Sequence, residues 1–175
     1  MHMVSRLTSQ MLRAAQADTT SSRGLRNITN GDAGLLQGFN FNNSASLPAT
    51  LSAHYTVSFT RSSGTIQLSI EDFIPFRTLT ALAGTTHFRF VAAAAAVNFR
   101  DNSYDAATTT SVNLVYNNNI ATSALTLSMT LPANSTDPVF IALGIEFLQQ
   151  VNGDHYALYN RAANACSIIK EDTLA

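Results

Sequence analysis

Apolar and polar residues alternate with a period of two through most of the chain after residue 54. The clearest alternating segments are 55–60, 66–70, 88–90, 112–116 and 125–131. Each has one apolar face and one face rich in hydroxyl groups, which is typical of a strand that packs one side on a core. The pattern predicts an all-β fold: an antiparallel β-sandwich of about seven to nine strands with Ig-like or jelly-roll connectivity.

Two segments depart from this alternation. Segment 139–151 is nearly continuous in apolar residues and predicts a central strand that is buried on both faces, or that packs one face against a partner. Asn152-Gly153 directly after it predicts a tight hairpin. The alanine run 92–96 is shorter than a stable helix and is flanked by strand-like sequence, so we expect a strand there too. Its small side chains either fill a narrow gap between sheets or let another sheet, arm or subunit approach closely.

The expected core follows from the alternating apolar positions of these strands. It consists of Phe59, Ile66, Leu68, Phe88, Phe90, Val112, Leu114, Leu125, Leu127, Phe140 and Ile145.

The first part of the chain has a helical pattern. Over residues 4–17, apolar side chains recur at helical spacing on one face, at Val4, Leu7, Met11 and Ala15. A helix of this length is unstable alone, so the stripe needs a surface to cover it. We interpret the Ser/Thr-rich segment 18–24 as an extended linker. The chain then divides into an N-terminal helix and extended arm, 1–38, and a β-sandwich domain, 39–175. Our hypothesis is that this helix is an assembly arm, which packs on another copy of the chain and drives assembly; the alternative is that it folds back on its own sandwich.

The composition limits the classes of partner. Only 12% of the residues are charged and the formal net charge is -1, so nothing favours nucleic acid or a membrane surface as a partner. Lys170 is the one lysine in the sequence. A surface with so few compact charges permits close packing between copies.

No motif for enzyme chemistry is present in the sequence. Glycine-rich phosphate loops, H-E-x-x-H, C-x-x-C and G-x-S-x-G are all missing, and the four histidines are dispersed. The lone cysteine, Cys166, lies in an apolar run and is interpreted as a buried small hydrophobe. The sequence therefore predicts a non-enzymatic protein with no catalytic residues, no cofactor and no metal site.

The sequence also bears on membranes and export. No window reaches the length of apolar residues that spans a bilayer, so we expect no membrane insertion. The N-terminus does not continue into an apolar segment, so we expect no signal peptide in this chain. Localisation stays open: cytoplasmic, or at the cell surface or outside the cell by another export route or after processing.

Three charged residues are candidates for an interface. Glu146 interrupts the most apolar strand, and a lone buried carboxylate there would be costly. It is either a functional or interface carboxylate paired with an arginine, or a rim residue that faces solvent near the hairpin. Arg23 and Arg26, in the segment after the helix, are the other two candidates.

Several segments carry a family resemblance: Ala17-Asp18-Thr19-Thr20, Arg23-Gly24-Leu25-Arg26-Asn27, 36–41 and 143–153. Together they resemble an uncharacterised family of β-rich proteins of the Bacteroidota, over most of the chain. The resemblance implies a β-rich fold and supplies no catalytic residues, because the family has no assigned activity. Members of the family carry a further basic, glycine-rich N-terminal region, which implies that this chain is a processed or truncated form.

Two functions are compatible with this pattern. The leading hypothesis is a non-enzymatic structural subunit that associates with other copies of itself in an oligomer, fibre or shell. The alternative is a carbohydrate- or surface-binding module, because sandwiches commonly bind sugars through exposed aromatic side chains. Its candidate residues are Tyr104, Tyr116, Tyr156 and Tyr159. The sequence has no tryptophan, the ring best suited to stacking on sugars, which counts against the alternative.

Overall fold

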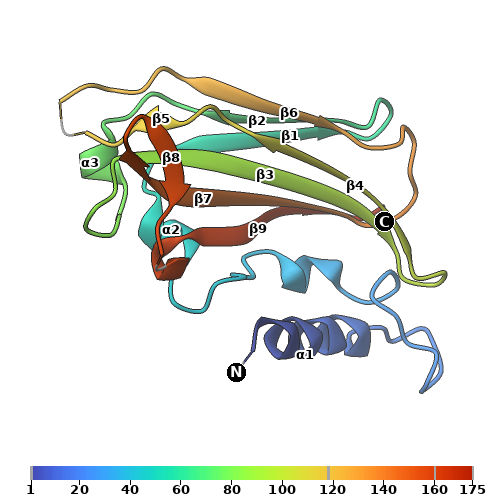
Figure 1. Ribbon diagram of the computed structural model, residues 1–175. Coiled ribbons are helices and arrows are strands. Elements are labelled where there is room, and N and C mark those ends of the chain that lie inside the picture. Colours follow the sequence, from blue (N-terminus) through green and yellow to red (C-terminus); the bar gives the residue numbers. More distant parts are fainter. Residues whose placement is uncertain (1, 118, 160, 175) are drawn as a thin grey trace.

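The computed structural model describes residues 2–117, 119–159 and 161–174. These residues form two antiparallel β-sheets that pack face to face, with a helix lying beside the larger sheet (Figure 1). The smaller sheet has the order β1-β2-β6, with β1 at Tyr55–Thr60, β2 at Thr65–Ile70 and β6 at Leu125–Thr130. This architecture confirms the prediction of an all-β antiparallel sandwich.

The larger sheet contains six strands in the order β4-β3-β7-β8, and β5 also pairs with β3 while β9 pairs with β7. Its strands are β3 His87–Asn98, β4 Ser103–Thr110, β5 Leu114–Val115, β7 Val139–Val151, β8 Asp154–Ala157 and β9 Ala165–Asp172. The helical elements are α1 Met3–Gln16, η1 Ala33–Leu36, α2 Leu47–Thr50, α3 Pro75–Thr78 and η2 Arg161–Ala163. As predicted, the alanine run is strand and segment 139–151 is the long central strand β7. Only one face of β7 is buried throughout residues 139–147, and its last three residues are exposed.

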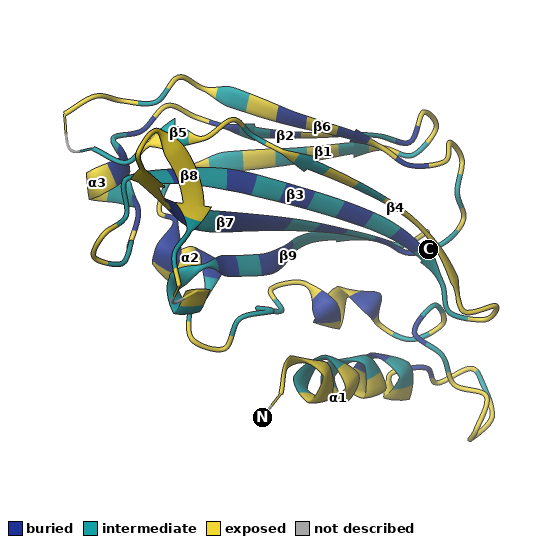
Figure 2. Ribbon diagram, viewed as in Figure 1, coloured by how far each residue is buried: buried dark blue, intermediate teal, exposed yellow. Residues whose placement is uncertain are grey.

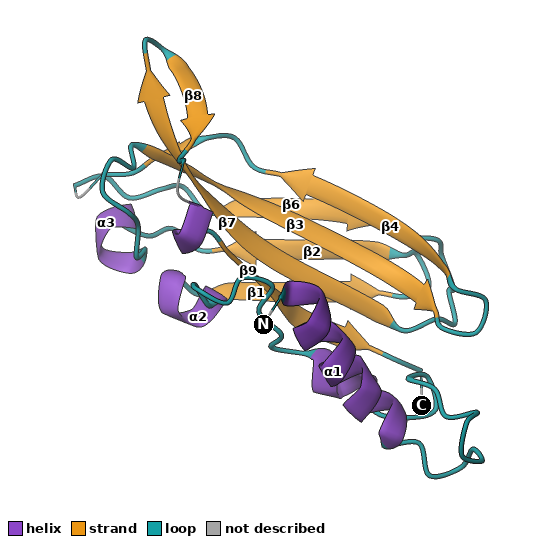
Figure 3. Cartoon of the chain, turned by 60° about the horizontal axis from the view of Figure 1, so that its bottom comes forward, coloured by secondary structure: helices purple, strands orange, loops and turns teal. Residues whose placement is uncertain are grey.

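The hairpin between β7 and β8 turns at Asn152 and Gly153, which have φ angles of 54° and 94°. Both values lie in the left-handed region that asparagine and glycine tolerate best. The tight hairpin expected from Asn152-Gly153 is therefore confirmed. Figure 3 shows this hairpin projecting from one end of the larger sheet, while α1 lies beside the other.

The hydrophobic core lies between the two sheets, and six of the residues expected there are buried: Ile66, Leu68, Phe88, Phe90, Leu127 and Ile145. Phe59, Leu114, Leu125 and Phe140 are half-buried and pack at its margins or on the arm. The prediction for Val112 was wrong, because its side chain is 76% exposed. The alternation at 112–116 produces only the two-residue strand β5, and Val112 precedes it.

Strand β4 is absent from the sequence-based expectations. Its sequence, Ser-Tyr-Asp-Ala-Ala-Thr-Thr-Thr, has no apolar alternation, and most of its residues are exposed. It forms because every residue from Ser103 to Thr110 pairs with β3 in an unbroken antiparallel register. Tertiary pairing therefore determines this strand, and hydrophobic pattern does not.

Helix α1 folds back on its own chain. The Arg6 guanidinium donates hydrogen bonds to the carbonyl oxygens of Asn40 and Phe41, each at 2.9 Å, and Gln10 Nε2 donates to the Leu35 carbonyl at 2.7 Å. Ala14 is fully buried. Its carbonyl lies so close to Gly31 that a Cβ there would meet the oxygen at 2.1 Å, so the packing requires a glycine.

The covered face of α1 differs in part from the expected stripe. Leu7, Met11 and Ala15 are half-buried, whereas Val4 is 65% exposed. The covered face is centred on Ala14, which lies about 80° around the helix from Val4. Val4 is therefore not part of the intramolecular contact, and the helix has a fold-back arrangement in this structure.

The segment 18–24 is not the extended linker that we expected. Asp18 is fully buried. Its carboxylate accepts hydrogen bonds from the backbone amides of Thr20 and Ser21 at 2.9 Å, from the Thr20 hydroxyl at 2.9 Å and from the Asn27 amide at 3.3 Å. The hydrogen bonds of Ser21 and then Thr20 outweigh desolvation and hold the pKa of Asp18 well below its usual range. The loop is thus ordered around one carboxylate.

Arg61 ties the smaller sheet to the larger one. It lies at the turn between β1 and β2, and its guanidinium donates to the carbonyls of Ser135 and Asp137 at 2.6 and 3.1 Å. It also donates to the Asp172 carbonyl at 2.7 Å and forms an ion pair with the Asp172 carboxylate. The Arg61 side chain is 15% exposed and lies over the Phe59 ring. One side chain therefore joins three separate segments.

Replacing Arg61 tests this role. Arg61→Ala is expected to lower the free energy of unfolding by about 2–4 kcal/mol, because it leaves several carbonyls and a carboxylate without their donor. Arg61→Lys is the control: it keeps the charge but loses the planar fork, so it should recover less than half of the loss. Urea unfolding measures both. A change below about 0.5 kcal/mol for the alanine variant, as at an ordinary surface site, would contradict the role.

Because the loop after α1 is ordered around the ionised carboxylate of Asp18, we expect the stability of the arm to depend on pH. Because its pKa is lowered in the folded state, its stabilisation is present above the ordinary value of 3.8 and is lost as the pH falls below it. Asp18→Asn should reduce the hydrogen-exchange protection of the α1 amides near neutral pH. The difference from the wild type should shrink in strong acid. Wild-type protection in the Asp18→Asn variant near neutral pH would show that the charge does not order the loop.

Candidate functional site

The side chains of the alanine run point alternately into the core and toward the outer face of the larger sheet. Burial alternates along β3 as far as Ala96 (Figure 2). Ala92, Ala94 and Ala96 point into the core, while Ala93 and Ala95 point outward. The inward alanines fill the gap between the sheets, as one interpretation expected. The outward alanines leave the other side of the strand flat and apolar, which is what the second interpretation requires.

Neighbouring strands extend this flat region across the sheet. We name it the alanine face and define it by Val91, Ala93 and Ala95 of β3, Ala106 of β4, and Ala142 and Gly144 of β7. A hollow of about 200 Å³ lies on it, between these alanines and the side chains of Phe41, Phe140 and Ile168. An apolar sheet face normally packs on another layer. Among the residues that define it, Gly144 is buried beside the Cys166 side chain, and the others are half-buried or exposed.

The arm closes one end of the alanine face. The ring of Phe140 packs edge-on against Phe99, with centroids 6.2 Å apart. Both rings pack against the small cluster of Ala14, Ile28 and Ala33. The arm thus covers the beginning of β7 and leaves the middle of the strand open.

An ion pair marks the other end. Arg89 Nε donates to Glu146 Oε2 at 2.8 Å, and the two residues face each other across β3 and β7. The Glu146 side chain is 22% exposed. Glu146 therefore has the arginine partner that one interpretation expected, on the margin of the alanine face. Arg23 and Arg26 are exposed in the loop after α1, and among the described residues neither forms an ion pair with Glu146.

Beyond the ion pair, the β7–β8 hairpin projects from the end of the sheet and contacts β3 through two histidine rings. The rings of His87 and His155 meet edge to face, with centroids 4.2 Å apart. Thr86 Oγ1 accepts a hydrogen bond from the Gln150 amide at 2.7 Å and lies 3.0 Å from His87 Nδ1. Burial, and then the neighbouring His155, lowers the pKa of His87. These contacts fix the hairpin, so it bounds the alanine face as the arm does.

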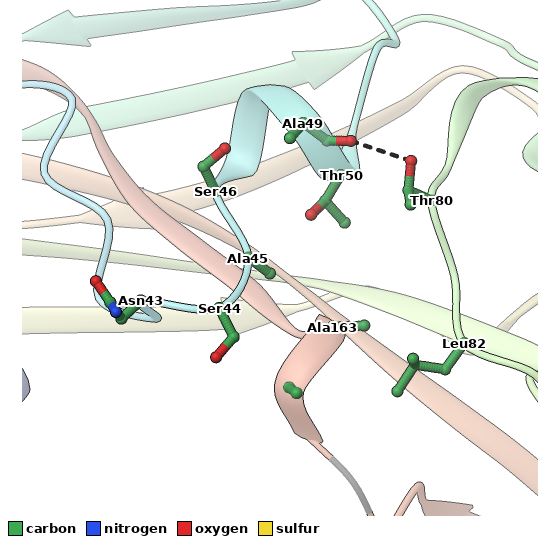
Figure 4. A pocket seen from close by; sticks show the side chains of 10 residues that line it. Asn43, Ser44, Ala45, Ser46, Ala49, Thr50, Thr80, Leu82 and Ala163 are labelled. Atoms are coloured by element: carbon green, nitrogen blue, oxygen red, sulfur yellow. Dashed lines mark hydrogen bonds between the residues drawn. The ribbon is translucent and has the colours of Figure 1, made fainter.

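A second hollow has a different character. It has a volume of about 480 Å³ and lies between η2 and the segments around α2, where hydroxyl side chains such as Ser44, Ser46 and Thr80 line it (Figure 4). The Thr80 hydroxyl is already engaged by the Ala49 carbonyl at 3.0 Å. No aromatic side chain lines this pocket. It therefore lacks the ring on which a sugar would stack.

The four tyrosines proposed for sugar binding do not come together. Tyr104 pairs with Val97 near one end of β3, whereas Tyr156 and Tyr159 lie near the β7–β8 hairpin at the other end, roughly 30 Å away along the strand. Tyr116 packs on Phe76 with ring centroids 5.9 Å apart. No stacking platform results from these residues.

Groups suited to metal binding are also separated. Within the described ranges no three His, Cys, Asp or Glu side chains gather closely enough to hold a metal ion. Cys166 lies beside Gly144 on the outer side of the sheet, and burial raises the pKa of its thiol. A thiol with a raised pKa is a poor nucleophile. No helix among the described residues is long and apolar enough to cross a bilayer.

Comparisons with known proteins give little further information. No family model matches the chain, and no curated protein matches it either. Among solved structures, one described under "pH-induced modulation of Streptococcus parasanguinis adhesion by Fap1 fimbriae" is similar at 10% sequence identity and a TM-score of 0.34. The match covers 72% of this chain and 84% of that one. At this level the likeness carries no argument, and the resemblance to the Bacteroidota family stays a prediction.

Proposed function

We propose that the protein is a non-enzymatic structural subunit that associates with other copies of itself. The observation that carries the proposal is the alanine face: a flat, apolar area in the middle of a sheet, bounded on both sides but covered by neither. Two ordered segments of the chain, the arm and the β7–β8 hairpin, stop at its margins. The area is therefore available to a second layer.

A second copy is the occupant that fits this surface best. Ala93, Ala95, Ala106 and Ala142 project only methyl groups, so another sheet could approach closely. At the margin, the charges of Arg89 and Glu146 already neutralise each other within the chain. The surface therefore presents no net charge that would select an oppositely charged partner or repel an identical one.

Light scattering over a concentration series tests the proposal. The wild-type mass should rise with concentration, and Ala93→Lys should lower it at every concentration because a charge would be buried between copies. Gln67→Lys is the matched control: Gln67 is exposed on β2, the central strand of the other sheet, so this lysine should leave association unchanged. A wild-type protein that stays monomeric throughout the series would contradict the proposed function.

A further inference from the structure

The two long edges of the larger sheet differ in whether another segment of the chain covers them. The edge at β9 is closed by segment 38–41. The Gly38 amide donates to the Ile168 carbonyl at 2.8 Å, the Ile168 amide to the Phe39 carbonyl at 3.0 Å, and the Phe41 amide to the Cys166 carbonyl at 2.9 Å. A register shift in the β7–β9 pairing also makes the strand at this edge irregular. Bulges and covering segments are the usual protections of a sheet edge.

The opposite edge, at β4, has neither a register shift nor a second strand paired with it among the described residues. All eight residues from Ser103 to Thr110 pair with β3 without a register shift. Within the described part of the chain, no strand pairs with the other side of β4. Its sequence contains no proline and no lysine, and Asp105 is its one charged residue. A long, regular and weakly charged edge of this kind is a template for another strand.

The backbone groups that are free on β4 follow from the phase of the β3–β4 ladder. The Ser111 amide donates to the Phe90 carbonyl at 2.9 Å, which places this pair in the hydrogen-bonded class. Hydrogen-bonded pairs alternate along an antiparallel ladder. The backbone N–H and C=O groups of the odd-numbered residues of β4 therefore point toward β3. The free N–H and C=O groups belong to the even-numbered residues: Tyr104, Ala106, Thr108 and Thr110.

We infer that β4 pairs antiparallel with β4 of a second copy, across a two-fold axis that passes beside Ala107 and stands perpendicular to the sheet. This inference rests on the proposed function, because it names one contact through which the copies associate. With the axis at this residue, Tyr104 pairs with Thr110 of the copy and Ala106 pairs with Thr108. Every free backbone group of the edge then has a partner. If the axis passed beside Ala106 instead, the backbone groups of Thr110 would lie beyond the end of β4 of the copy and would have no partner there.

The side chains suit this register. Ala107 opposes its own copy in a pair without hydrogen bonds, where side chains come closest, and a methyl group fits there. Asp105 opposes Thr109, so no like charges face each other and the hydroxyl can donate to the carboxylate. Tyr104, which is 72% exposed in one chain, lies over Thr110 of the copy. The edge is thus complementary to itself in backbone, size and charge.

Pairing at β4 also joins the two alanine faces. A two-fold axis perpendicular to the sheet keeps the outer face of each copy on the same side. Ala106 lies on β4 and belongs to the alanine face, so the face would continue from one copy to the next. The edge contact therefore extends the surface on which the proposed function depends.

Disulfide trapping tests the register directly. In a Cys166→Ala background, Ala107→Cys should form a cross-linked dimer under mild oxidation, because the two thiols would face each other at the axis. Ala106→Cys is the matched control: its Cα would lie about 8 Å from its own copy, beyond the range of a disulfide. We expect at least a tenfold difference in cross-linking rate. Faster cross-linking of the control, or none by the Ala107→Cys variant, would overturn the inference.

A proline substitution tests the hydrogen bonding separately. The Thr108 amide points away from the sheet, so Thr108→Pro should leave the single chain folded while it removes a donor from the new ladder and obstructs the approach of the copy. Thr108→Val, which keeps the amide and the branched shape, is the control. The proline variant should need about tenfold higher concentration to associate, and the valine variant should behave like the wild type.

The outcomes separate the two proposals. If the wild type associates but neither the cysteine nor the proline variant behaves as expected, the contact lies elsewhere, at the edges of β1 or β6 or on the alanine face alone. The β4 inference is then wrong while the proposed function stands. If the wild type is monomeric at every concentration, both fail. Circular dichroism and the melting temperature of each variant exclude misfolding as the cause.

Discussion

A β-sheet exposes unpaired backbone groups along each of its edges, and the larger sheet of this protein covers those groups on one side only. The edge at β9 is closed by the chain itself, through segment 38–41. That closure determines where the arm lies, because Arg6 of α1 binds the carbonyl groups of Asn40 and Phe41 at the end of the same segment. The position of the N-terminal helix thus follows from the protection of one sheet edge.

The alanine run connects the core to the outer surface. Because a strand alternates its side chains, Ala92, Ala94 and Ala96 fill the interior while Ala93 and Ala95 flatten the exterior. Larger residues at the inward positions would push the two sheets apart. Larger or charged residues at the outward positions would give the sheet an ordinary solvent-facing surface. One short run therefore sets the packing of the sandwich and also the character of its outer face.

The hydrophobic pattern predicted the parts of the fold that burial determines. The all-β class, the long central strand and the Asn152-Gly153 hairpin all follow from apolar alternation or turn chemistry, and the structure contains each of them. The hydrophobic pattern did not predict the parts of the fold that form for reasons other than burial. Strand β4 is largely exposed, so its sequence carries no alternation, and Val112 carries the alternation without being buried.

The interactions that the sequence did not predict in the arm and in the candidate site depend on how the chain is packed. Arg61 acts through hydrogen bonds to carbonyl groups distant in sequence, which no local pattern reveals. Asp18 accepts most of its hydrogen bonds from the nearby residues Thr20 and Ser21, but its burial depends on how the loop packs. Glu146 could be recognised as unusual within an apolar strand, but its partner Arg89 is fixed only by the β3–β7 register. Edges and partners are properties of the assembled sheet, and they require the structure.

Residue-resolved hydrogen exchange at low and high protein concentration tests the open edge most directly. If copies pair through β4, the amides of Tyr104, Ala106, Thr108 and Thr110 should become protected as the concentration rises. The amides of Asp105, Ala107 and Thr109 should change little, because they already donate to β3. Protection that rises equally at odd and even positions, or at neither, would contradict the account.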